Sequence, residues 1–154
     1  MFYYKSLKKI KMKKLLVLTM VLVSFVSYGQ ISISQSKTIG LIKNGSSEDI
    51  KLSTSGKNIT LNYSGIDANN KWENSVIRFT GDENDLNTLY NAFISVFEPE
   101  NKDNKNYSLE LTLGNDVVKI ENKKMFGSPY LVFGNGKTHT RQLTKGQIET
   151  LFGK

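Results

Sequence analysis

Apolar and polar residues alternate along much of the chain, and this period of two predicts β-strands. The clearest case is residues 58–64, where Ile59, Leu61 and Tyr63 alternate with polar residues. Weaker versions of the pattern predict seven further strands: 38–43, 49–54, 76–80, 107–113, 116–121, 129–133 and 137–142. Glycine and asparagine separate most of these segments, as expected for tight turns. Gly114-Asn115 in particular predicts a two-residue hairpin with a positive φ angle.

A helical spacing of apolar residues interrupts the strands after residue 80. One apolar stripe contains Leu86, Leu89, Tyr90, Phe93 and Phe97. It predicts an amphipathic helix with one buried face.

Both ends of this helix have sequence signals. Thr80 and Glu83 have the spacing of a capping box, and Pro99 stops the helix. Thr144 and Gln147 repeat the box before a short second helix that runs through residues 148–152.

The order of these elements predicts an α+β fold, mainly antiparallel β-sheet with two amphipathic helices. A flexible segment, 30–37, precedes a single domain, 38–154, with halves 38–98 and 107–154. Each half has the order ββββα, and segments 86–90 and 148–152 share the series aliphatic, polar, Thr, Leu, aromatic. A tandem duplication would explain this likeness. The simpler explanation is that the starts of amphipathic helices look alike, because the two halves share little residue identity outside the helices.

The first 29 residues predict a cleavable Sec-type export signal. They contain six lysines and no acidic residue, followed by a twelve-residue apolar run, 15–26. A membrane-spanning helix needs about 20 apolar residues, so an uncleaved anchor is the weaker alternative. We expect cleavage between Gly29 and Gln30 and no stable membrane anchor afterwards. Met12 is an alternative start that leaves this interpretation unchanged.

Removing the signal changes the charge of the chain. The whole sequence has 21 basic and 14 acidic residues, a net charge of +7, and removal of six lysines leaves 15 against 14. A domain that follows nucleic-acid phosphates needs a clear basic surplus, so nucleic acid is not an expected partner. The chain has no cysteine, which excludes disulfides, thiolate metal sites and a cysteine nucleophile.

Trp72 is the most notable candidate for binding. It is the only tryptophan and lies in the polar segment 68–74, which reads as a loop. Either it anchors that loop to the core, or it is an exposed aromatic that contacts a sugar or a partner protein. Tyr63 and Tyr130, together with Tyr107, are candidates to extend such a patch.

No catalytic or metal-ligating set emerges from the sequence. His139 is the only histidine, and we interpret it as a surface residue of a strand. No cofactor motif is present, because Gly136-Lys137-Thr138 lacks the upstream glycine of a phosphate-binding loop.

We therefore predict an exported, non-enzymatic binding protein of the periplasm or cell exterior, whose partner is a protein or a cell-envelope polymer. One alternative is a small secreted hydrolase that uses scattered carboxylates or His139. The other is a structural subunit that adds strands edge to edge in an envelope assembly.

Overall fold

The computed structural model describes residues 35–154, and Ser34–Lys154 form one compact unit. The predicted signal peptide and its cleavage site at Gly29 and Gln30 lie outside the described residues. Of the predicted flexible segment only 35–37 are described, and Lys37 is already the first residue of a strand.

The described residues form eight strands, two α-helices and one short 3-10 helix. The strands are β1 (Lys37–Asn44), β2 (Ser47–Ser55), β3 (Asn58–Asp67), β4 (Trp72–Thr80), β5 (Ser108–Leu113), β6 (Asp116–Met125), β7 (Ser128–Gly134) and β8 (Thr138–His139). The helices are α2 (Glu83–Ile94), η1 (Ser95–Phe97) and α3 (Lys145–Leu151). The predicted class, mainly antiparallel β-sheet with two helices, is confirmed.

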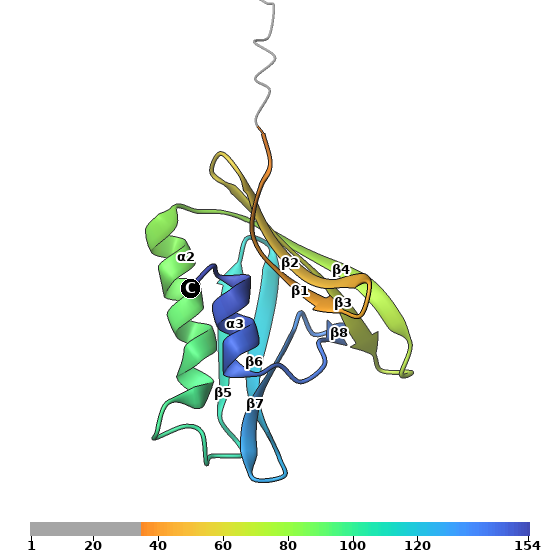
Figure 1. Ribbon diagram of the computed structural model, residues 1–154, viewed down its shortest axis with the longest axis vertical. Coiled ribbons are helices and arrows are strands. Elements are labelled where there is room, and N and C mark those ends of the chain that lie inside the picture. Colours follow the sequence, from red (N-terminus) through yellow and green to blue (C-terminus); the bar gives the residue numbers. More distant parts are fainter. Residues whose placement is uncertain (1–34) are drawn as a thin grey trace, which may run out of the picture. The chain divides into compact units, whose positions relative to one another are not determined.

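Two antiparallel meanders make up a single curled sheet. One contains β1 to β4 and the other β5 to β7, and the short strand β8 joins them. His139 of β8 pairs with Ile66 of β3 on one side and with Gly134 of β7 on the other. Figure 1 shows α2 and α3 side by side on one side of this curved sheet.

A chain of aromatic contacts ties the two meanders and both helices into one core. Tyr63 of β3 meets Phe133 of β7 with ring centroids 5.1 Å apart, and Phe93 of α2 lies 5.0 Å from Phe133. Phe152, directly after α3, lies 5.6 Å from Phe93. Because each ring belongs to a different element, the core fixes how the sheet bends at β8.

One predicted helix cap is confirmed and the other is wrong. Thr144 and Gln147 form the capping box of α3 as predicted. The cap of α2 is instead Asp82, whose carboxylate accepts from the backbone N–H groups of Asn84 and Asp85. α2 begins at Glu83, so the cap is the residue directly before it, and Thr80 lies two positions too early.

Several strand boundaries also differ from the prediction. β4 begins at Trp72 rather than at residue 76, because long-range pairing with β3 extends through the polar residues 72–75. β8 covers only two residues of the predicted strand 137–142. The predicted hairpin at Gly114-Asn115 is confirmed, with φ of 61° at Gly114.

The order ββββα recurs in both halves of the described chain. The tandem duplication nevertheless stays a prediction, because β8 is a two-residue strand that pairs with β3 of the other half. In the described part of the chain, no helix has the length and apolar character needed to cross a bilayer.

Candidate functional site

Three side chains form a row on the face of the sheet opposite the helices, which we call the outer face. Residues of β3 alternate between the core and this face, and Ile66 lies on the outer face. Ile66 pairs directly with Trp72 of β4 and with His139 of β8. Directly paired residues point to the same face with Cβ atoms about 4.5–5.5 Å apart, so the three side chains are neighbours. Trp72 is 57% exposed, although tryptophan normally buries most of its surface.

A groove lies beside this row, where β3, β8, β7 and β6 meet. It consists of two adjoining hollows of ≈ 230 and ≈ 320 Å³ that are both lined by Ile66, Glu121, Val132 and His139. We call it the junction groove. Val132 lies on the outer face of β7 yet is only 6% exposed, so the groove has an apolar floor between polar walls.

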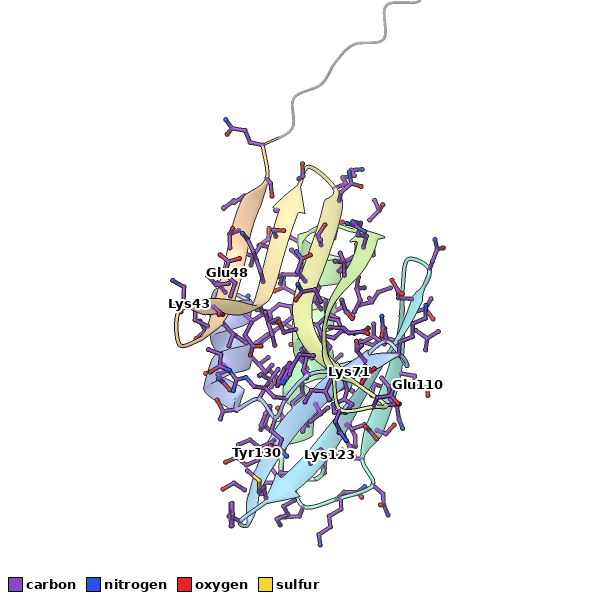
Figure 2. All side chains as sticks on the ribbon, turned by 90° about the vertical axis from the view of Figure 1, so that its right-hand side faces the viewer. Lys43, Glu48, Lys71, Glu110, Lys123 and Tyr130 are labelled. Carbon is purple, nitrogen blue, oxygen red and sulfur yellow. The ribbon has the colours of Figure 1, made fainter. Side chains whose placement is uncertain are left out.

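Basic side chains dominate the walls of the junction groove. The charged residues that line it are Lys119, Lys123, Lys137, Arg141, Asp67 and Glu121. Figure 2 shows Lys123 beside Tyr130, its partner across the β6–β7 hairpin. The near-neutral charge expected for residues 30–154 therefore includes a locally basic surface.

Glu121 holds two of these lysines in place. Its carboxylate oxygens lie 3.1 Å from Lys119 Nζ and 3.6 Å from Lys123 Nζ. Partial burial raises the pKa of Glu121, but the hydrogen bond from Lys119 and the charge of Lys123 outweigh this effect and leave the pKa below its usual value. The three side chains alternate along β6, so all of them face the groove.

We expect Glu121→Gln to lose more stability at neutral pH than in acid. A carboxyl group with a lowered pKa stabilises the fold above its unfolded value of 4.5, and this contribution disappears as the pH falls through the lower folded pKa. The free energies of unfolding of the native and Gln chains, measured by urea titration from pH 7 to pH 3, should therefore converge below pH 4.5.

Glu110→Gln is the matched control for this experiment. Glu110 is exposed on β5, pairs in register with Lys119 and makes no ion pair among the described residues. Its substitution should give a small difference at every pH. A Glu121→Gln difference that does not change with pH would contradict the stabilising ion pairs.

The turn between β3 and β4 is internally hydrogen-bonded and leads directly into Trp72. Asp67 Oδ1 accepts from the backbone N–H groups of Asn69 and Lys71, both at 2.8 Å. The bond from Lys71 is the main reason that the pKa of Asp67 lies below its usual value. Asp67 thus fixes the turn, and the turn presents Trp72 at the start of β4.

The tyrosines do not gather around Trp72. Tyr63 is 2% exposed, and its hydroxyl accepts a 3.1 Å hydrogen bond from Thr138 Oγ1 in the core. Tyr107 is half-buried, and its hydroxyl lies 2.7 Å from Ser95 Oγ. Only Tyr130 shares the outer face, paired with Lys123 of the groove wall. The structure therefore brings Trp72 together with His139 and Ile66 rather than with Tyr63.

His139 is exposed on β8, which confirms the interpretation as a surface strand residue. Its Nδ1 lies 3.0 Å from the carbonyl oxygen of Thr140. A carbonyl can only accept, so Nδ1 is the donor in this contact. Glu121 lines the same groove, but among the described residues no carboxylate lies within ion-pair distance of His139.

No group of three or more His, Asp or Glu side chains in residues 35–154 is arranged to hold a metal ion. The chain matches no protein-family model, and no curated protein or solved structure is significantly similar to it. The role of the site therefore follows from its geometry alone.

The alternation of Lys119, Glu121 and Lys123 along residues 119–123 was the sequence signal that could have identified the groove wall.

Proposed function

We propose that this protein is an exported, non-enzymatic binding protein that holds its ligand in the junction groove and against Trp72. The observation that carries the proposal is the row of Trp72, Ile66 and His139 at the rim of a groove with an apolar floor. An exposed tryptophan beside a hollow is a typical anchor of binding surfaces, because its large ring gains much when a ligand covers it.

The chemistry of the groove favours an extended anionic ligand. Four basic side chains line the groove against two carboxylates, which leaves a surplus of positive charge. Arg141 is paired with Asp49, and Lys119 and Lys123 share Glu121. Lys137 makes no ion pair among the described residues, so it is the basic side chain most available to a ligand. Acidic groups of a ligand would meet lysines, and a sugar or other flat ring would stack on Trp72. An anionic cell-envelope polysaccharide combines both features, and it agrees with the export signal predicted at the N-terminus.

Trp72→Ala should weaken such binding about tenfold, the effect of removing one aromatic hot spot. The probe is alginate, a polymer of uronic acids, with neutral dextran for comparison. Binding of residues 34–154, the compact unit with its own core, is measured by retention on immobilised polymer. Because the chain has a single tryptophan, its fluorescence should change on addition of alginate and stay constant with dextran.

Val117→Ala is the matched control, since Val117 is another exposed apolar residue, 54% exposed on β6, and does not line the groove. Its retention on alginate should equal that of the native protein. Equal retention of the Trp72→Ala protein, with an unchanged circular dichroism spectrum, would contradict the role of Trp72.

The two alternatives have less support. A hydrolase would use His139 with an acid, yet the nearby carboxylate of Glu121 is bonded to Lys119 and Lys123. A structural subunit would add strands at an open edge, and β4 pairs only with β3 among the described strands. β4 carries Glu73 and Arg78, however, and charges on an edge strand oppose edge-to-edge pairing.

A further inference from the structure

The hairpin between β6 and β7 has an unusual turn. Four hairpins in the described chain have two-residue loops, namely Gly45-Ser46, Gly56-Lys57, Gly114-Asn115 and Phe126-Gly127. In the first three, glycine occupies the first position with φ of 61° or 62°. In the fourth, Phe126 occupies it with φ of 50°, followed by Gly127 at 84°.

Phenylalanine is poorly suited to this position. Two consecutive positive φ angles define a type I′ turn, whose first position favours Asn, Asp or Gly. A bulky side chain in the left-handed region is strained, because its Cβ crowds the backbone. The strain is not offset by packing, since Phe126 is 97% exposed. A residue that breaks a local rule without any gain in the folded protein points to a function at that position.

The residues behind Phe126 are arranged in layers along the hairpin. Met125, 37% exposed, lies next to it at the tip. Lys124 follows, and then Lys123 is paired across the hairpin with Tyr130. From the tip inward, the hairpin thus presents first apolar side chains and then lysines together with the amphipathic side chain of a tyrosine.

We propose that this tip, Met125 to Gly127, inserts into the headgroup region of an anionic lipid bilayer and anchors the domain there reversibly. The apolar side chains of Phe126 and Met125 would enter the acyl boundary. Tyrosine favours the interface just above it, and lysine side chains reach the lipid phosphates from there. A pocket of a partner protein would accept Phe126 equally well but would not require this order of layers.

The charges around the tip limit the strength of the interaction. Lys124 Nζ is bonded to Asp103 at 2.6 Å, and Lys123 shares Glu121 with Lys119. The Lys123 side chain is 50% exposed and can still approach phosphates, whereas that of Lys124 is only 23% exposed and contributes less. One aromatic side chain and two partly neutralised lysines give weak, reversible membrane association. Lys123 belongs to both surfaces, but Phe126 does not line the junction groove, so a change at Phe126 tests membrane binding separately from polymer binding.

Phe126→Asn separates the effect of residue 126 on the stability of the turn from its effect on membrane binding. Asparagine suits the left-handed position, so the variant should unfold at the same temperature as the native protein or higher. Its partition into vesicles of phosphatidylglycerol and phosphatidylcholine should fall about tenfold or more, because the apolar ring is lost. Co-sedimentation with the vesicles measures the partition, using residues 34–154 so that the apolar run 15–26 does not contribute.

Val117→Asn is the matched control, because it removes an exposed apolar side chain from the opposite end of β6, away from the tip. It should bind vesicles as the native protein does. Equal partition of the native and Phe126→Asn proteins would overturn the proposal. Failure of the native protein to sediment with vesicles, or equal binding to purely neutral phosphatidylcholine, would overturn it as well.

Discussion

Replacing Asn122 by alanine should lower the free energy of unfolding by about 3 kcal/mol, because one side chain holds the loop between η1 and β5. Asn122 is 1% exposed on the inner face of β6. Its Nδ2 donates to the carbonyl oxygens of Asn101, Lys102 and Asn104 at 2.9, 3.1 and 3.1 Å. Alanine would remove all three hydrogen bonds, each worth about 1 kcal/mol. The carbonyls of Asn101 and Asn104 keep their backbone donors, the N–H groups of Asn104 and Tyr107, so the loss comes from the bonds to Asn122 and not from stranded carbonyls. Urea unfolding of residues 34–154, followed by circular dichroism, measures the loss.

Asn122→Asp tests whether the stabilising effect of Asn122 comes from the hydrogen bonds that its Nδ2 donates. Aspartate has nearly the same shape but presents only oxygens to the three carbonyls, so it should destabilise at least as much as alanine. Asn115→Ala, in the exposed β5–β6 turn, is the control and should change stability by less than about 0.5 kcal/mol. A milder effect of aspartate than of alanine would contradict the donor role of Asn122.

The same loop shows where sequence patterns stop being informative. Residues 101–106 look like a plain polar linker, and nothing in their composition indicates a common anchor on β6. The anchor is Asn122, about twenty positions further along, in a segment that reads as an ordinary strand with polar residues. Local patterns predict elements well because the period of a strand or helix is local. They do not predict which distant side chain completes a loop.

Helix caps illustrate the limit at a shorter range. The spacing of Thr80 and Glu83 and that of Asp82 and Asp85 are both acceptable boxes, and they overlap. The choice depends on where β4 ends, and its pairing with β3 extends to Thr80. At the second helix Thr144 and Gln147 have no overlapping competitor, and that prediction was correct.

The candidate site was predictable only in part. Trp72 and His139 stood out because each is the only residue of its kind, and the structure places them two strands apart on one face. Their neighbourhood depends on the pairing of β3 with β8, which lie some seventy residues apart in the chain. Tyr63 was a candidate for the same patch, although the alternation in its strand puts it on the apolar face. Its position beside the core residues Ile59 and Leu61 was the available signal.

Gly134→Ala should have the second large effect, a loss of about 3 kcal/mol in unfolding free energy together with weakened binding in the groove. An added Cβ would lie 2.1 Å from the carbonyl oxygen of Thr138 and 2.9 Å from the Cα of His139. Both neighbours are backbone atoms, so β8 would have to move, which would disturb the pairing of His139 with Ile66.

Gly146→Ala, the control, is the same chemical change in the first turn of α3, where nothing lies within 4 Å of the added Cβ. It should raise stability by up to about 1 kcal/mol. Urea unfolding should therefore separate the two variants in opposite directions, while retention on alginate should fall for Gly134→Ala and stay unchanged for Gly146→Ala. Equal stability of both variants would show that β8 does not need the close approach at Gly134.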